Sequence, residues 1–326
     1  MPQVLDKIFS ALIFSPAGQS RDSRSRAVKN VRRHAASLMV KIGNKYPLLL
    51  LPMFDQICTT VENLSRHDAH AQLSMLERVT LQEALLLISN HFCDYERQSS
   101  FVAEVMREAN VHWSTIASVG AFKDATEFMK FMGIDKPPVL PNAVDPCAQN
   151  RINLIFCLNL LLGAVKRCAW PEDPERAGRG GFVVALTESG NPICRNPAAS
   201  HVVPLLPHIL SLMKIFNELF TPEAEAVLHE DYRCCLTMLD FEKCNLLGTI
   251  SHCSESSDII ILTPVDRMQR FLTALHESCY HMMGSIGSSL GRDLYSLPNL
   301  GPAIVTSILS HLQVIINIYS INITQL

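Results

Sequence analysis

The side chains best suited to chemistry in this sequence are the cations of one short segment near its start. Six basic residues fall within thirteen positions, opposed only by Asp22: Arg21, Arg24, Arg26, Lys29, Arg32 and Arg33. Arg26, Lys29 and Arg33 are spaced i, i+3 and i+7, so a helix places them on one face. Such a stripe of cations suits the phosphates of a nucleic-acid backbone. A solvated helix face and a nuclear localisation signal are two other interpretations of the same pattern.

A second group of cations surrounds a long stretch rich in glycine and proline, residues 171–198: Lys166, Arg167, Arg176, Arg179 and Arg195. Arg179 lies within Gly178-Arg-Gly-Gly-Phe182, which resembles one copy of an RNA-binding RGG segment. A loop of this length inside a folded chain is usually functional. Both groups therefore indicate a polyanion as a partner. Because the formal net charge is −3, such a partner must be met by local clusters and not by overall attraction.

Metal or catalytic chemistry finds little support. His276, Cys279 and His281 are all possible metal ligands, but the two histidines are five residues apart, about 140° round a helix, whereas a zinc-protease helix needs a spacing of four. The sequence contains no nucleophile elbow and no kinase motif set. We therefore predict no enzyme, no catalytic residue, no metal and no cofactor.

The elements that must position the cations are amphipathic helices, which recur about every 40 residues as in HEAT and armadillo arrays. In the clearest case one apolar stripe is formed by residues at helical spacing: Met268, Phe271, Leu272, Leu275, Cys279, Met282 and Ile286. Helices joined by short turns pack as antiparallel pairs, and pairs stack on their neighbours. The predicted fold class is all-α, a HEAT-repeat α-solenoid built as a right-handed superhelix of such pairs.

The pattern also predicts where individual elements begin and end. Pro47 ends a helix from Ser23 to Tyr46, and Thr221 and Thr263 are N-caps that precede Pro222 and Pro264. Val183 and Val184 predict a strand or hairpin inside the loop 171–198. The other predicted helices span about 3–14, 71–92, 94–110, 112–119, 123–133, 149–170 and 200–219.

Composition favours an intracellular chain. The sequence opens with Met1-Pro-Gln-Val4, which is not a basic and apolar leader, so we expect its eleven cysteines to be reduced thiols. Residues 300–322 lack charges but carry several polar side chains, so we interpret them as a buried helix followed by an unstructured end and not as a membrane span.

Three stretches go beyond general helix patterns: Arg26-Ala-Val-Lys-Asn-Val-Arg-Arg-His-Ala35; Glu83-Ala-Leu-Leu-Leu-Ile-Ser-Asn90 with Tyr95-Glu-Arg-Gln98; and Gly180-Gly-Phe-Val-Val184 with Ser189-Gly-Asn-Pro-Ile193 and Arg195-Asn-Pro197. With Asp145-Pro-Cys147 and Arg267-Met-Gln-Arg-Phe271 in matching order, the chain resembles the central part of an export receptor of the importin-β-related family. The resemblance covers about residues 2–310. Receptors of this family are several times longer.

The resemblance implies a HEAT solenoid that shuttles between nucleus and cytoplasm and contacts nuclear pore proteins. It implies Ran in its GTP form as a partner, bound mainly through repeats that lie outside this sequence. As cargo it implies structured double-stranded RNA, chiefly precursor microRNA hairpins with a short 3′ overhang. The residues that we predict to contact RNA phosphates or the overhang are Arg26, Lys29, Arg33, Lys166, Arg167 and Arg195.

We therefore expect central HEAT repeats over residues 1–310, interrupted by the loop 171–198, and a divergent tail over residues 311–326. The alternative is a HEAT-repeat protein scaffold without RNA binding, in which the same cations form a solvated rim and partner proteins dock elsewhere.

Overall fold

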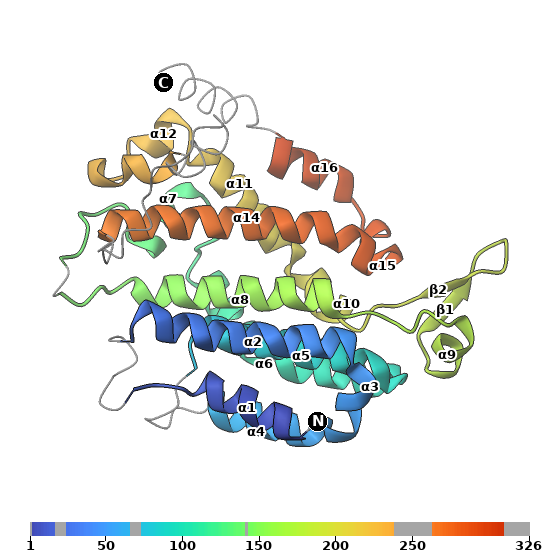
Figure 1. Cartoon of the computed structure of the whole chain (residues 1–326). Coiled ribbons are helices and arrows are strands. Elements are labelled where there is room, and N and C mark those ends of the chain that lie inside the picture. Colours follow the sequence, from blue (N-terminus) through green and yellow to red (C-terminus); the bar gives the residue numbers. More distant parts are fainter. Residues whose placement is uncertain (1, 17–23, 66–72, 141–142, 238–262, 310–326) are drawn as a thin grey trace, which may run out of the picture. The chain divides into compact units, whose positions relative to one another are not determined.

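The computed structural model describes residues 2–16, 24–65, 73–140, 143–237 and 263–309. Figure 1 shows that helices dominate, with one two-stranded hairpin among these residues. The all-α helical-repeat fold predicted from the sequence is confirmed. Arg21 and the tail 311–326 lie outside the described residues.

The helices and strands have the following bounds: α1 (Pro2–Leu12), α2 (Arg26–Lys45), α3 (Pro47–Leu50), α4 (Phe54–Ser65), α5 (Met75–Ser89), α6 (Tyr95–Ser118), α7 (Ala125–Met132), α8 (Ala148–Arg167), α9 (Pro174–Arg179), β1 (Val183–Leu186), β2 (Pro192–Cys194), α10 (Ala199–Val202), α11 (Leu206–Glu218), α12 (Pro222–Glu225), α14 (Pro264–Leu290), α15 (Arg292–Tyr295) and α16 (Leu300–Ile304). Short 3₁₀ segments lie at Leu51–Met53, Asn90–Phe92, Val203–Leu205 and Glu230–Leu236, and a π-helical turn at Val305–Leu309.

The chain divides into two compact units, which we describe separately. Unit 1 comprises Met1–Val111, Phe156–Pro204 and Met282–Ser296, and unit 2 comprises His112–Ile155, Leu205–His281 and Leu297–Leu326. All six predicted RNA contacts belong to unit 1.

In unit 1, α2, α5 and the end of α8 run in the same direction. Arg32 near the start of α2 bonds Glu77 near the start of α5, whereas Gly43 near the end of α2 lies against Ala84 and Ile88. On its other side α5 meets α8, where Gly163 lies against Glu83. Helix α5 is therefore flanked by α2 and α8, so that cations from both neighbours meet along it.

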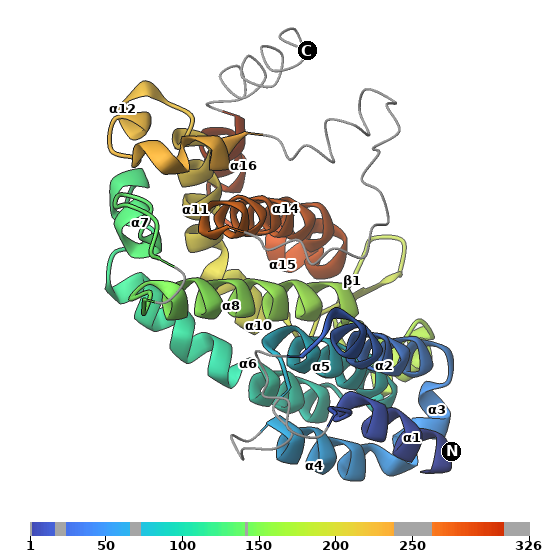
Figure 2. The same ribbon diagram turned by 60° about the vertical axis from the view of Figure 1, so that its left-hand side comes forward.

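A second set of helices covers the apolar side of α2 and α5. Helices α1 and α4 lie side by side in Figures 1 and 2 and line a common groove. Phe54 of α4 packs edge-on against Phe92 and Phe101, with ring centroids 4.8 and 5.0 Å away. The core that results includes residues of five helices, among them Leu5, Met39, Leu50, Ile57 and Leu85. This layer holds α2 in place while its other face stays in solvent.

The loop 171–198 contains α9 and the antiparallel hairpin β1–β2, which confirms the predicted strand or hairpin. Val183 pairs with Cys194 and Ala185 with Ile193, with an irregularity between them. The loop is fixed to α6 because the Tyr95 N–H donates to the Gly180 carbonyl at 2.8 Å. A two-stranded hairpin is marginal alone, so this anchoring stabilises it.

Gly180 sits where no larger residue fits. A Cβ atom there would lie 2.4 Å from the Cys93 carbonyl oxygen, whereas a Cβ at nearby Gly178 would meet nothing within 4 Å. We expect Gly180→Ala to release the loop from α6 and to speed proteolysis within residues 171–198. Gly178→Ala is the matched control and should stabilise α9 slightly, by about 0.5–1 kcal/mol. Equal cleavage of both variants in limited proteolysis would contradict this assignment.

Unit 2 is built around aromatic contacts. Trp113 stacks on Phe122 and donates from Nε1 to Nδ1 of His208 at 3.0 Å. Phe216 of α11 meets Phe128 and His276, with centroid distances of 5.6 Å in both cases. These contacts join the middle of α14, at His276, to α7 and α11 within the unit.

Several predicted helix signals are confirmed. Thr221 caps α12, with Pro222 at the first helical position. At the start of α14, Thr263 Oγ1 accepts from the Asp266 N–H, and Asp266 accepts from the Thr263 N–H in return. The predicted stripe of α14 is buried except for the half-buried Phe271.

Two predicted boundaries were wrong. The helices expected at 94–110 and 112–119 are one helix, α6, because the buried series Val102, Met106, Ala109 and Trp113 continues through the supposed break. Helix α8 ends at Arg167 and not at Trp170. There the side chain of Asn90, in the 3₁₀ segment after α5, donates to the Arg167 carbonyl at 2.7 Å and accepts from the Ala169 N–H at 3.0 Å. These backbone groups are therefore bonded by a distant side chain and not within a helix.

Two helical stretches in the described part of the chain are long and apolar enough to cross a membrane by length and composition, Ala148–Arg167 and Ala199–Glu218. Half of each is buried inside the protein, as is common in core helices of soluble proteins.

Candidate nucleic-acid interface

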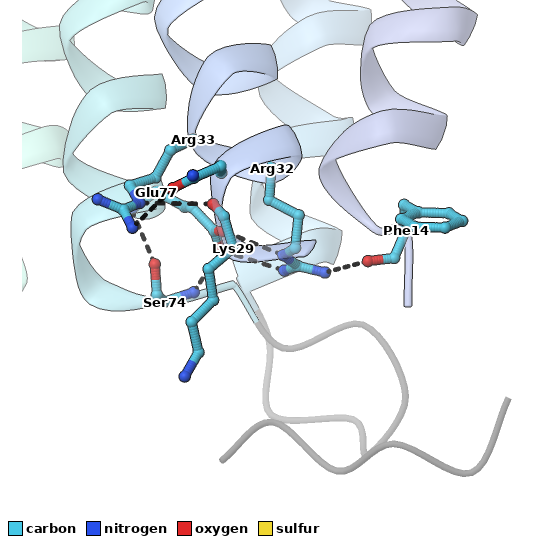
Figure 3. A network of polar contacts seen from close by, with 7 residues as sticks. Phe14, Lys29, Arg32, Arg33, Ser74 and Glu77 are labelled. Carbon is cyan, nitrogen blue, oxygen red and sulfur yellow. Dashed lines mark hydrogen bonds and ion pairs between the residues drawn. The ribbon is translucent and has the colours of Figure 1, made fainter. Parts of the chain in front are cut away.

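The centre of the candidate interface is a buried ion pair that the sequence pattern did not reveal. Arg32, counted above among six available cations, is fully buried, and this corrects that part of the interpretation. Its Nε and Nη2 atoms donate to the two carboxylate oxygens of Glu77, at 3.0 and 3.1 Å. Its Nη1 atom reaches the Phe14 carbonyl at 3.5 Å. Figure 3 shows this network joining α2, α5 and the segment after α1.

Glu77 has a second role at the start of α5. Its carboxylate accepts from the Ser74 N–H at 2.7 Å, and the Ser74 hydroxyl accepts from the Glu77 N–H at 3.2 Å. This is a capping box, which satisfies two backbone donors that a helix start leaves without partners. The sequence signal was present in Ser74-Met-Leu-Glu77. One carboxylate therefore caps α5 and binds it to α2.

The cations beside this pair remain in solvent. Ser25 caps α2, and Arg26, Lys29 and Arg33 are exposed on the following turns, as the spacing predicts. Among the described residues, Arg33 donates to two neutral groups, the Lys29 carbonyl and the Asn30 side chain. Within the described residues, the side chains of Arg26 and Lys29 form no hydrogen bond and no ion pair. The positive charges of these three residues are not compensated by a described carboxylate.

A shallow hollow of about 250 Å³ lies between α2 and the start of α5. Its walls are formed by Arg24, Lys29, Arg32, Arg33, Ser74, Leu76 and Glu77. In Figure 3, Lys29 and Arg33 border the Glu77 network from α2. Among the described residues that line it, the exposed cations are Lys29 and Arg33, Arg24 and Arg32 are buried, and the one carboxylate, Glu77, is paired with Arg32. The excess positive charge of these residues favours an anion.

Lys166 and Arg167 lie at the end of α8, on the other side of α5. Lys166 is exposed and has no partner in the described part of the chain. Arg167 donates from Nε to Glu83 at 2.8 Å and is about one third exposed, 35%. Since Glu83 follows Glu77 by six residues, the two anchoring points are about 9 Å apart along α5. Lys166 and Arg167 therefore lie on one side of α5, and the three exposed cations of α2 (Arg26, Lys29 and Arg33, called the α2 group below) lie on the other side.

Arg195 lies within the loop 171–198 and is bonded to another part of it. Its Nε and Nη2 atoms both donate to the Gly181 carbonyl, at 3.1 and 3.0 Å. Its guanidinium lies 3.4 Å from the centre of the Tyr95 ring and 3.5 Å from the Glu96 carboxylate. A guanidinium held in this way braces the hairpin against α6 and has fewer donors left for a ligand.

Two further loop cations pair locally within α9. Arg176 lies 3.6 Å from Asp173, and Arg179 lies 3.3 Å from Glu175. Both pairs are exposed, so each contributes little to stability.

The residues considered for a metal do not converge. Cys279 is fully buried in the α14 stripe, and His276 lies between the rings of Phe216 and Tyr280. Burial lowers the pKa of His276. No group of three possible ligand side chains in the described ranges is placed to hold a metal ion.

The described cysteines are free thiols. Burial raises the pKa of the Cys168 thiol to about 12, which disfavours the reactive thiolate.

Comparison with known proteins places these observations in a family. The sequence model of the Exportin-5 family matches residues 1–322. The chain is 39% identical to Exportin-5 of Homo sapiens over 308 residues, and equally similar to that of Mus musculus. It is 24% identical to Exportin-5 of Dictyostelium discoideum over 320 residues.

These alignments cover 94 to 96% of this chain but only 25 to 27% of each relative. The chain therefore spans about a quarter of the length of the relatives that it matches. The family match reaches into the segment 311–326, for which a divergent tail remains a prediction. By the match over nearly its whole length, the chain belongs to the Exportin-5 family.

Proposed function

We propose that this chain is the part of a nuclear export receptor that holds the phosphate backbone of double-stranded RNA. The observation that carries the proposal is the group Arg26, Lys29 and Arg33, three exposed cations on one face of α2 beside a hollow. The described carboxylate beside them, that of Glu77, is already paired with Arg32, so these cations keep most of their attraction for phosphates. Each phosphate that they neutralise should contribute about 0.7 to 0.9 to the salt dependence of log K.

The other three predicted contacts contribute to different degrees. Lys166 is exposed and available, so it joins the α2 group as a direct phosphate contact. Arg167 uses Nε for Glu83, which leaves its terminal nitrogens to approach RNA. Arg195 has intramolecular partners and is 36% exposed, so it suits a contact to an unpaired overhang better than to a buried phosphate.

A carrier of varied hairpins needs this kind of surface. The major groove of A-form RNA is deep and narrow, so side chains do not read its base edges easily. Contacts to phosphates and 2′-hydroxyls give affinity without sequence preference. Binding of this kind makes and breaks no covalent bond, so the proposal assigns the chain no enzymatic activity.

Membership of the family supports the wider proposal. A full receptor would bind Ran-GTP, carry precursor microRNA hairpins with a short 3′ overhang, contact nuclear pore proteins and shuttle between nucleus and cytoplasm. This chain would contribute part of the cargo surface.

A protein scaffold without RNA binding is the second candidate, because Arg167 and Arg195 already have intramolecular partners. Filter binding with a hairpin RNA, with and without Ran-GTP, separates the two functions. The proposal expects sequence-tolerant binding that weakens steeply with salt. Binding no tighter than that of an uncharged-surface control protein would favour the scaffold.

A further inference from the structure

The hollow between α2 and α5 has the properties of a discrete anion site. Its volume of about 250 Å³ accommodates a tetrahedral oxyanion together with a few water molecules, since water occupies about 30 Å³ in the liquid. Lys29 and Arg33 both line it, one turn of α2 apart. Two cations that line one hollow can both bind oxygens of a single anion.

The one carboxylate in the wall does not repel such an anion strongly. Both oxygens of Glu77 are engaged, by the guanidinium of Arg32 and by the Ser74 N–H. The charges of Arg32 and Glu77 therefore cancel locally, and the positive charge that remains at the hollow includes Lys29 and Arg33.

The same pair makes the wall rigid. Arg32, on the buried face of α2, is 0% exposed, and Glu77 is 4% exposed. The bidentate bond fixes the rotation of α2 against the start of α5. The backbone positions from which Lys29 and Arg33 project are thereby fixed before a ligand arrives, which lowers part of the entropy cost of binding.

We propose that this hollow binds one phosphate group, shared by Lys29 and Arg33 and positioned by the Arg32–Glu77 pair. The chemistry is that of a phosphate oxyanion, either in an RNA backbone or free in solution. The RNA source rests on the proposed function above, whereas the site itself does not. In this site two cations bind one phosphate, whereas on a diffuse basic surface each cation attracts a phosphate of its own.

The experiment compares three forms of the full 326-residue chain: wild type, Lys29→Ala with Arg33→Ala, and Lys41→Ala with Lys45→Ala as matched control. Lys41 and Lys45 are exposed on the same helix, outside the hollow. Inorganic phosphate replaces chloride at constant ionic strength, and the midpoint of thermal unfolding is measured. We expect phosphate to raise the midpoint of wild type and control more than that of the Lys29/Arg33 variant.

The RNA arm measures how binding of a hairpin depends on salt. We expect the Lys29/Arg33 variant to bind about tenfold more weakly and its log–log slope to fall by one phosphate, about 0.7 to 0.9, and not by two. The control should keep the wild-type slope.

The outcomes separate the site from the function. Equal losses in the Lys29/Arg33 and Lys41/Lys45 variants, or a slope that falls by two phosphates, would overturn the shared site while RNA binding stands. A wild-type chain that does not bind RNA, but whose phosphate-induced stabilisation is lost only in the Lys29/Arg33 variant, would refute the proposed function and support a site for free phosphate. Identical phosphate effects in all three forms would overturn the site.

Discussion

Reversal of three charges on α2 is expected to remove most of the RNA affinity of this chain. In the variant Arg26→Glu, Lys29→Glu and Arg33→Glu, we expect affinity for a hairpin RNA at moderate salt to fall by about 100-fold or more, because lost attraction is replaced by repulsion. The slope of log K against log salt should fall by about two phosphates, one at the hollow and one at Arg26. All three side chains are exposed, so the fold should survive.

The matched control reverses Lys41 and Lys45, exposed cations of the same helix. Filter binding at four or more salt concentrations gives both affinity and slope, and circular dichroism checks helix content. The assignment of RNA contacts to the first turns of α2 would be refuted by a slope that stays at the wild-type value. An equal fall in the control would show that only the net charge of the helix matters.

Removal of the Glu77 carboxylate is expected to have the largest effect on stability. Glu77→Ala leaves the guanidinium of Arg32 buried without its carboxylate, and breaking a buried pair in this way costs about 3–5 kcal/mol. The same substitution also removes the capping box of α5. The loss should fall on unit 1, where α2 and α5 are joined.

A double variant distinguishes the charge from the packing. Arg32→Met with Glu77→Gln removes both charges and keeps a side chain that can cap α5, so it should cost less than Glu77→Ala alone. Urea unfolding followed by circular dichroism measures both. If the double variant is at least as unstable as the single one, the uncompensated charge is not the cause.

Local patterns predicted those features that local interactions determine. The stripe of α14 and the caps at Thr221 and Thr263 are confirmed because burial at helical spacing and capping involve residues within a few positions. The hairpin in the loop 171–198 is confirmed for the same reason, since Val183 and Val184 favour a strand. Arg26, Lys29 and Arg33 are exposed because helical spacing places them on the face of α2 opposite its buried apolar residues.

Long-range pairings were not predictable in this way. Arg32 shares its face with Val28, Ala35 and Met39, and it is the pairing with Glu77, 45 residues away, that explains why a charge is buried there. Arg167 has its partner Glu83 at a separation of 84 residues. The end of α8 depends on Asn90, which begins the 3₁₀ segment after α5 and lies 77 residues before Arg167. A single sequence carries no direct record of which helices will be neighbours.

The central claim is that RNA covers the cations on both sides of α5, and chemical footprinting of lysines tests it most directly. Lys29 and Lys166 are exposed in the free chain, and Lys41 and Lys45 are exposed internal references on α2. The chain is acetylated briefly with and without saturating hairpin RNA, and modification of each lysine is measured by mass spectrometry. We expect RNA to protect Lys29 and Lys166 several-fold more than Lys41 and Lys45. Equal modification of Lys29 and Lys166 in the presence and absence of bound RNA would contradict it.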